Sequence, residues 1–260
     1  MVEEKMKVCL LKALRYISKG LWLGLLVVSF VPPHVAAAEN TARLSNPSRS
    51  LSAQGVTVTR LNTETLFVVV LHPKRANFEQ EYKSREARHM ADWVVDSGDN
   101  NNMPFVIVDK LDARVFVFDA DGQIRGASPA LLGLARGDNS VPGIGDRELS
   151  DVRPEERTTP AGRFIASLGY NFNGKDVLWV DYNGAVSLHR VITTDPAEHR
   201  LQRLATPTPL DNRISYGCIN VPVKFYDTVV RPAFAGTNGI VYVLPETHSN
   251  NEFFAYYDVS

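Results

Sequence analysis

The 260-residue sequence predicts a mainly β domain with short helices and long loops, preceded by a small α/β extension. Three observations predict this fold. Apolar runs of strand length, rich in β-branched and aromatic residues, recur from residue 104 onward. Turn dipeptides such as Asp121-Gly122 and Asn183-Gly184 separate these runs, and they are typical of tight hairpins. The longest amphipathic stretch, by contrast, precedes this region, which assigns that helix to the extension.

The first 38 residues are typical of an export signal. A basic segment containing Lys5, Lys7, Lys12, Arg15 and Lys19 precedes an apolar run of about eleven residues at positions 21–31, which is too short to span a bilayer. Pro32-Pro33 interrupts that run, and three alanines at 36–38 offer a cleavage site before Glu39. An uncleaved membrane anchor is the alternative. After cleavage we expect no stable membrane insertion, a net charge near −4, and Cys218 as the only thiol, since Cys9 is lost.

Residues 39–102 form the predicted extension. A Ser- and Asn-rich leader at 39–54 is expected to be flexible, and the apolar end of 56–71 predicts a strand. An amphipathic helix is predicted over 78–96, packed against the following domain. The turn residues at 98–102 mark the boundary, which leaves 103–246 as the main domain and 247–260 as a tail.

The main domain at 103–246 is predicted to be built largely from hairpins. Residues 105–108 and 114–118 predict one hairpin, and residues 127–134 lead into a long polar loop at 135–158. Residues 177–182 and 185–191 predict a second hairpin around Asn183-Gly184, and 239–244 a closing buried strand. Short helices are predicted at 194–204 and 223–230.

Cys218 and His189 are the candidate catalytic residues. Cys218 follows a glycine and precedes an expected helix start at 221–222, where a helix N-terminus would stabilise a thiolate. Alternation along its strand places Val186 and Leu188 in a core, and Ser187 and His189 on the opposite face. A purely structural histidine is the alternative, and His199 is a rival base that has the surroundings of a solvated helix residue.

The sequence around Cys218, Ser215-Tyr216-Gly217-Cys218-Ile219-Asn220, resembles the cysteine motif of the YkuD-type L,D-transpeptidases, Ser-His-Gly-Cys-(Ile/Leu/Val)-(Arg/Asn). Thr159-Pro160-Ala161-Gly162-Arg163-Phe164 is similar to the family's Thr-Pro-x-Gly-x-Phe segment, and the strand ending in His189 is similar to its catalytic-histidine strand. The three stretches occur in the family's order and cover roughly residues 104–245.

This resemblance implies an L,D-transpeptidase-like β-sandwich in the cell envelope or periplasm, with a role in cell-wall cross-linking and cell shape. Cys218 would attack the bond between an L-centre and D-alanine in a peptidoglycan stem, and an amine from an acceptor stem would resolve the thioester. Gly217, Tyr216, Ser215, Asn220 and Arg190 would line the site or its oxyanion hole, and a backbone carbonyl just after His189 would orient the imidazole. The mechanism requires neither metal nor organic cofactor.

Two residues depart from the family pattern. Tyr216 replaces a histidine and Arg190 replaces a glycine, and the segment between His189 and Cys218 is longer than usual. An L,D-carboxypeptidase, or a peptidoglycan-binding module that has lost turnover, therefore remain alternatives.

Other classes fit the sequence less well. The net charge of −1 and the absence of a basic run argue against a nucleic-acid partner, and no His, Cys, Asp or Glu cluster has zinc-ligand spacing. Papain-like enzymes place the cysteine before the histidine. Sortases share the order His, Cys, Arg with His189, Cys218 and Arg231, but their threonine-rich strand before the cysteine is absent here.

Overall fold

The computed structural model describes residues 56–59, 67–70 and 73–259. The expected signal peptide with Cys9, and the leader at 39–54, lie outside these residues. In the extension, β1 (Val56–Thr59) and β2 (Phe67–Val70) form an antiparallel pair, where the sequence predicts a single strand. None of the helices in the described part of the chain has both the length and the apolar character needed to cross a bilayer.

The predicted amphipathic helix is confirmed as α2 (Arg85–Ser97), although it begins seven residues later than predicted. It begins there because Ser84 is its N-cap, whose hydroxyl accepts a hydrogen bond from the Ala87 amide at 3.0 Å. Gly98 ends the helix in the left-handed conformation, with φ at 71°. Phe78, predicted inside the helix, packs into the same core from the preceding loop.

The predicted mainly β class is confirmed. The strands after α2 are β3 (Phe105–Asp109), β4 (Arg114–Phe118), β5 (Ile124–Pro129), β6 (Leu132–Gly133), β7 (Gly162–Tyr170), β8 (Asp176–Asp181), β9 (Val186–Arg190), β10 (Arg213–Ser215), β11 (Ile219–Val221) and β12 (Gly239–Val243). Eight of them form one sheet in the order β11-β9-β8-β7-β12-β3-β4-β5, and β10 pairs with β6. The predicted closing strand β12 is fully buried at the centre of this sheet.

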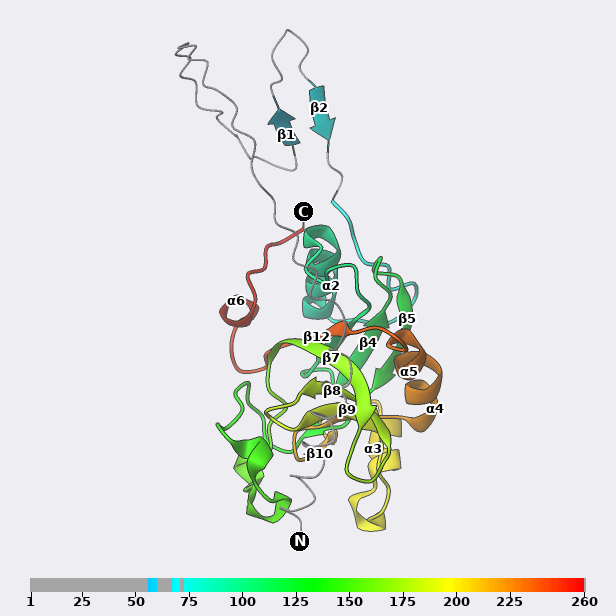
Figure 1. The fold of residues 1–260 in the computed structure, drawn as a ribbon, viewed down its shortest axis with the longest axis vertical. Coiled ribbons are helices and arrows are strands. Elements are labelled where there is room, and N and C mark those ends of the chain that lie inside the picture. The colour runs from blue at the N-terminus through cyan, green and yellow to red at the C-terminus, as the bar shows by residue number, and fades with distance from the viewer. Residues whose placement is uncertain (1–55, 60–66, 71–72, 260) are drawn as a thin grey trace, which may run out of the picture. The chain divides into compact units, whose positions relative to one another are not determined.

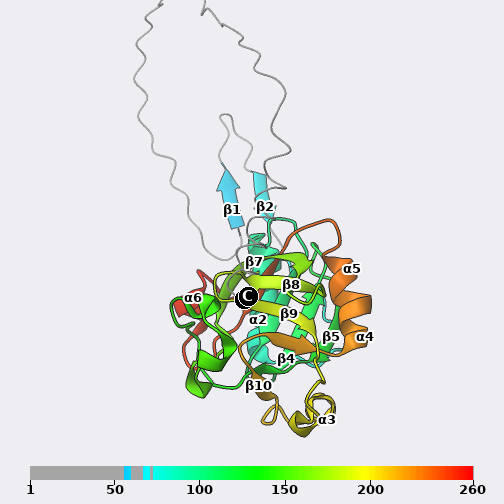
Figure 2. The ribbon, with the colours of Figure 1, turned by 60° about the horizontal axis from the view of Figure 1, so that its bottom comes forward.

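The large sheet bends so that its two halves share a core. Val106 and Val115 from one half and Leu178, Leu188 and Ile219 from the other belong to one apolar cluster. The expected sandwich is therefore made by a single curled sheet, because its right-handed twist brings the two ends toward each other. The predicted helix at 223–230 adds Tyr226 and Val230 to this cluster. It consists of three consecutive helical segments: α4 (Val223–Phe225), a π-helical turn (Tyr226–Val230) and α5 (Arg231–Ala233). Figure 2 shows α4 and α5 along one side of the strands.

The other face of the sheet is covered over only part of its width. There α2 packs Met90, Trp93 and Val94 onto aromatic and aliphatic side chains of β3, β4 and β12 (Figure 1). Phe105 and Phe118 stack in this layer with ring centroids 4.7 Å apart. The C-terminal tail, which includes α6 (Asn250–Phe253), adds Phe254 to the same layer. None of the described helices lies over the part of this face formed by β7, β8 and β9, and Ile165 on β7 is 66% exposed.

Long connections flank the uncovered part. Residues 134–161 contain three short 3-10 turns, Ile144–Asp146, Leu149–Asp151 and Pro154–Glu156, in place of the long predicted loop. The predicted helix at 194–204 is a 3-10 turn (Pro196–Glu198) capped by Asp195, followed by α3 (Arg200–Ala205). His199 between them is exposed, as expected of a solvated residue.

Candidate active site

The structure brings Cys218 and His189 together at one end of the large sheet. His189 lies near the end of β9, and Cys218 immediately precedes β11, which pairs with β9 in parallel. The register aligns Asn220 with His189, so that Cys218 lies beside Ser187. The Ser187 Oγ and Cys218 Sγ atoms are 3.7 Å apart. Parallel strand pairing thus makes neighbours of two residues that are far apart in the sequence.

The predicted alternation along β9 is confirmed. Val186 and Leu188 enter the shared core, which leaves Ser187 and His189 on the uncovered face. The hairpin around Asn183-Gly184 is also confirmed, but its strands end at Asp181 and start at Val186 rather than one residue closer on each side. Ala185 belongs to the turn, and its carbonyl accepts a weak hydrogen bond from Cys218 Sγ at 3.6 Å. The turn therefore borders the thiol.

The helix expected to start at 221–222 starts one residue later, at Val223 with Pro222 as its N-cap, but it does not adjoin Cys218. Residues 219–221 form β11 between them. The helix dipole acts mainly on groups within its first turn, and the net dipole of a sheet is small. Stabilisation of a thiolate at Cys218 must therefore come from the side chains and amides around it.

Those neighbours favour a thiolate–imidazolium pair. Burial raises the pKa of Cys218, but hydrogen bonding and charge interaction with His189, together with the backbone and hydroxyl of Ser187, outweigh it and lower the pKa of the thiol below its usual range. For His189, burial lowers the pKa, whereas the hydrogen bond and charge interaction with Cys218 and the hydrogen bond to the Arg190 backbone raise it, with a net increase. The residue Cys218 as a whole is partly exposed.

His189 is oriented by the backbone of the next residue. Its Nδ1 lies 2.7 Å from the Arg190 carbonyl oxygen, which only accepts, so Nδ1 is the donor and carries a proton. The other ring nitrogen, Nε2, is then left for the thiol. This carbonyl has the position that the family resemblance implies for the group that orients the imidazole.

The Arg190 side chain does not line the site. It shares the Val186 and Leu188 face of β9, where its guanidinium pairs with Asp176 at 3.0 Å and with Asp227. It also lies over the Tyr226 ring, 4.3 Å from the centroid. The expectation of a site-lining Arg190 is wrong for its side chain, because strand alternation turns it away from His189.

Gly217 and Ser215 shape the turn that presents Cys218. Gly217 has φ at 130°, and a Cβ at this position would lie 2.8 Å from the Thr158 carbonyl oxygen, so the turn requires glycine. Ser215 is buried; its hydroxyl accepts from the Gly217 amide at 3.1 Å and donates to the Cys218 carbonyl at 2.6 Å. Ser215 thus stabilises the turn through two buried hydrogen bonds and does not line a substrate groove.

Thr159, from the Thr-Pro-x-Gly-x-Phe segment, supports the same turn from the opposite side. Its buried hydroxyl donates to the Gly217 carbonyl at 2.9 Å and accepts from the Gly133 amide at 2.9 Å. A Cβ on Gly133 would lie 2.4 Å from the Arg157 carbonyl oxygen, so these segments approach very closely. Threonine is therefore needed at 159 for its hydroxyl, a role that the sequence comparison alone does not indicate.

The backbone amides of Gly217 and Cys218 differ in whether they are free to donate a hydrogen bond to an oxyanion. The Gly217 amide is occupied by Ser215 Oγ, and in the part of the chain that the structure describes the Cys218 amide takes part in no hydrogen bond. A donor beside the nucleophile that stays free is what an oxyanion needs. Of the two amides, that of Cys218 is the one able to serve.

Tyr216, in the place of the family's histidine, lies at the surface with 39% of its area exposed. The Arg157 guanidinium stacks on its ring, 3.9 Å from the centroid, and also donates to the Val152 carbonyl. Tyr216 therefore forms one rim of the turn through a cation–π contact. Arg157 was not expected from the sequence, since nothing local signals its approach to residue 216.

Asn220 is buried rather than exposed to a ligand. Its amide nitrogen donates to the Cys218 carbonyl at 3.2 Å, and its oxygen accepts from Arg200 Nη1 at 2.8 Å. Its backbone exchanges hydrogen bonds with Leu131. Arg200 is a second residue that the sequence did not reveal; it comes from the long segment between His189 and Cys218.

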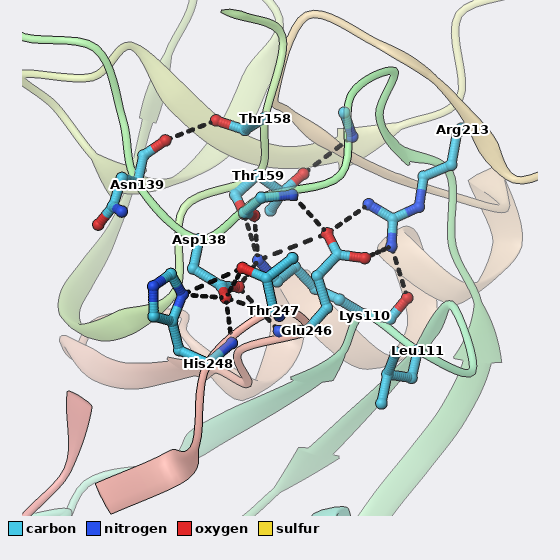
Figure 3. Close-up of polar contacts among 12 residues, drawn as sticks. Lys110, Leu111, Asp138, Asn139, Thr158, Thr159, Arg213, Glu246, Thr247 and His248 are labelled. Atoms are coloured by element: carbon cyan, nitrogen blue, oxygen red, sulfur yellow. Dashed lines mark hydrogen bonds and ion pairs between the residues drawn. The ribbon is translucent and has the colours of Figure 1, made fainter. Parts of the chain in front are cut away.

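A buried ionic cluster anchors the strand that leads to the cysteine (Figure 3). Lys110 Nζ donates to Asp138 at 2.7 Å and to two carbonyls, and Glu246 accepts from Arg213 of β10 at 2.6 Å. Burial lowers the pKa of Lys110. Burial opposes ionisation of Asp138 as well, but hydrogen bonds from Lys110, Thr247 and His248 hold the pKa of that carboxyl well below its usual value. The two cations and two carboxylates balance, which ties β10, the loop at 138 and the C-terminal segment into one unit.

Neither of two surface cavities contains the Cys218–His189 pair. One of about 400 Å³ lies against Phe234 and Thr237, and another of about 470 Å³ lies between Arg114 and the loop at 204–212. Among the described residues no group of three or more His, Cys, Asp or Glu side chains is arranged to hold a metal ion. The candidate site is thus an open face with an activated thiol.

No family model and no curated protein matches the sequence. Among solved structures, the chain is similar to the helical cell shape determining protein Pgp2 from Campylobacter jejuni, with 17% identity over 56% of this chain and 49% of that one, at a TM-score of 0.35. It is also similar to the L,D-transpeptidase LdtMt1 in complex with imipenem, with 14% identity over 54% and 58% of the two chains, at 0.31. A third is the catalytic domain of an E. faecium L,D-transpeptidase, with 18% identity over 55% and 98%, at 0.29. The chain spans about half the length of the first two.

Proposed function

We propose that this protein is a cysteine acyltransferase that acts on peptidoglycan stem peptides, with Cys218 as nucleophile and His189 as its acid–base partner. The observation that carries the proposal is geometric: the parallel pairing of β9 with β11 places Cys218 beside Ser187, on the strand face that also bears His189. In this setting the pKa of the thiol is lowered and that of the imidazole is raised. The fixed Nδ1 contact with the Arg190 carbonyl and the partial exposure of Cys218 support it.

The acylation step follows from this arrangement. The Cys218 thiolate attacks the carbonyl carbon of the L-centre and forms a tetrahedral oxyanion beside the free Cys218 amide. When the oxyanion collapses, the C–N bond breaks, and the leaving nitrogen takes the proton from His189 Nε2. D-alanine departs as an amine, and a thioester remains on Cys218.

The second step restores the enzyme. Neutral His189 removes a proton from the acceptor amine as its nitrogen attacks the thioester carbonyl. The C–S bond breaks, sulfur leaves as the thiolate, and His189 keeps the proton. The ion pair is then present again, and the acyl group has moved from D-alanine to the acceptor.

The choice of substrate rests on the three sequence stretches that resemble the L,D-transpeptidases. We further infer that the protein is exported to the cell envelope by its N-terminal segment, which is cleaved near residue 38. Determining the N-terminal residue of the protein recovered from the envelope fraction of expressing cells tests this inference, and a chain that begins at Met1 there would contradict it.

The activity is tested by intact-protein mass after incubation of the full-length chain with a stem tetrapeptide, and separately with imipenem. We expect an adduct on Cys218 in the native protein and none in Cys218→Ala. A native protein whose thiol reacts with iodoacetamide but acquires no adduct from either reagent would refute the proposal.

Product analysis then separates transfer from hydrolysis. With a diamino acceptor peptide present, a cross-linked product together with free D-alanine identifies an L,D-transpeptidase. Free D-alanine and tripeptide with no cross-link identifies an L,D-carboxypeptidase, and binding of stem peptides without D-alanine release identifies a binding module.

A further inference from the structure

Arg200 lies beside the two candidate catalytic residues. His189 and Asn220 are paired in the register of β9 and β11, and both lie on the face opposite the shared core. Because Arg200 Nη1 donates to Asn220 Oδ1 at 2.8 Å, the guanidinium lies next to the imidazole on that face. Its charge lowers the pKa of His189, although by less than burial does and against a net increase. The cation is therefore close enough to act on groups that His189 contacts.

The Arg200 guanidinium is held by hydrogen bonds through two of its nitrogens, and its third nitrogen has no described partner. Nε donates to Glu198 at 2.6 Å, and the side chain is only 11% exposed. Nη2 makes no hydrogen bond to any described residue, and it is not among the buried side-chain atoms that lack a partner. Among the described residues Nη2 therefore keeps its donor capacity free, in an orientation set by Glu198 and Asn220.

Arg203, one turn onward in α3, provides a useful contrast. It donates to the Glu198 carbonyl at 2.8 Å and to the Asp211 carbonyl at 2.6 Å. Both of its partners are backbone groups of its own segment, so its role is to hold that segment together. Arg200 instead reaches out of the segment to the strand that carries Cys218.

We propose that Arg200 forms a carboxylate-binding subsite beside Cys218 and His189, which binds the free α-carboxylate of the amino acid that leaves during acylation. This inference rests on the proposed function and specifies its substrate: a stem whose fourth residue is C-terminal. Arginine suits this role because its planar guanidinium matches a carboxylate, and its charge persists at every relevant pH.

The chemistry of the leaving group supports this position. His189 protonates the leaving nitrogen, and the carboxylate is attached to the carbon next to that nitrogen. A cation beside His189 therefore lies where this carboxylate arrives. Glu198 neutralises part of the Arg200 charge, which leaves a directed donor rather than a diffuse field. A stem whose fourth residue carries a C-terminal amide lacks this negative charge, and in a longer stem the terminal carboxylate lies further from Arg200.

The test compares acylation of Cys218 by a tetrapeptide with a free C-terminal carboxylate and by the same peptide with a C-terminal amide. We expect the native full-length chain to prefer the acid by roughly 10- to 100-fold in kcat/KM, the effect of a hydrogen bond to a charged group. Arg200→Gln should reduce this preference to a few-fold, mainly by slowing the acid, and Arg200→Lys should retain part of it. Arg203→Gln is the matched control and should keep the native ratio.

The ratio of the two peptides isolates recognition, because any change in the His189–Cys218 pair affects both peptides equally. If Arg200→Gln leaves the acid-to-amide ratio at the native value, the subsite is overturned, whether or not both rates fall. Equal slowing of both peptides would assign Arg200 a positioning role through Asn220.

A second measurement separates this proposal from the proposed function. N-acetyl-D-alanine and its amide are compared as protectants of Cys218 against iodoacetamide. Protection by the acid alone, lost in Arg200→Gln, supports the subsite even if neither peptide forms an adduct, a result that would refute the acyltransfer proposal only. Equal protection by both compounds, or none by either, contradicts the subsite.

Discussion

One face of the large sheet is used in two different ways. Over β3, β4 and β12 it is sealed by α2 and filled with aromatic and aliphatic side chains. Over β7, β8 and β9 none of the described helices covers the same face, which carries Ile165, Ser187 and His189. Cys218 thus lies at the part of the sheet that the described helices leave uncovered. The covered part supplies the burial that keeps the sheet folded.

His189→Ala has the largest expected effect, and it is confined to the open part. Loss of the acid–base group should slow acylation of Cys218 by roughly 10²- to 10⁴-fold, the usual contribution of general acid–base catalysis. Thermal unfolding should change little, because the ring is partly exposed. The adduct rate by mass spectrometry and the melting temperature measure the two effects, and His199→Ala is the control. Comparable rates for the two variants would remove His189 from the mechanism.

Ile240 and Ile165 test the comparison directly, since they are cross-strand partners on the same face. Ile240 is fully buried under the covered part, so Ile240→Ala should destabilise the fold by about 2–5 kcal/mol. Ile165 is already mostly exposed, and Ile165→Ala should change stability by less than about 0.5 kcal/mol. Denaturant unfolding of both variants measures the difference. Similar losses at the two positions would mean that the open part is covered in solution.

The pH dependence of alkylation at Cys218 tests how His189 acts on the thiol in the open part of the sheet. Because His189 lowers the pKa of Cys218, alkylation by iodoacetamide should rise with pH at a midpoint below that of free cysteine. In His189→Ala the burial of the thiol and its contacts with Ser187 remain, but the lowering by His189 is lost, so the midpoint should move to higher pH than in the native protein. A native profile that coincides with free cysteine would contradict the thiolate–imidazolium pair.

Tyr216→Ala has the smallest expected effect. It removes the stacking contact with Arg157 at the rim, which contributes about 0.5–1 kcal/mol at exposed positions. The free energy of unfolding should fall by about that amount, and Arg157→Ala should produce the same loss. A double variant that loses no more than either single variant would show that the two residues act as a pair.

The sequence was sufficient for much of this arrangement. Alternation along β9 correctly separated the core residues from Ser187 and His189, and Asn183-Gly184 marked the hairpin. Gly217 was recognised as a turn residue, and its φ of 130° confirms that reading. Each of these predictions depends on local backbone geometry, which short stretches of sequence encode.

The errors have a common origin. The helix after Cys218 begins near its expected position, but residues 219–221 pair with β9 as a strand and separate the helix from the thiol, and that pairing depends on the long-range register. The Arg190 side chain was assigned to the site because it follows His189, although alternation turns it toward Asp176 and Asp227. Arg157 and Arg200 escaped notice because their partners lie in distant segments.

Residue order alone was enough to select Cys218 and His189 as candidates and to locate the strands around them, because periodicity and turn chemistry act over a few neighbours. Which atoms surround that thiol became apparent only in three dimensions. The parallel pairing of β9 with β11 sets the Ser187 contact, and the approach of α3 brings the Arg200 guanidinium to Asn220. Such contacts join segments whose meeting depends on the packing of the whole sheet, and no local pattern encodes it.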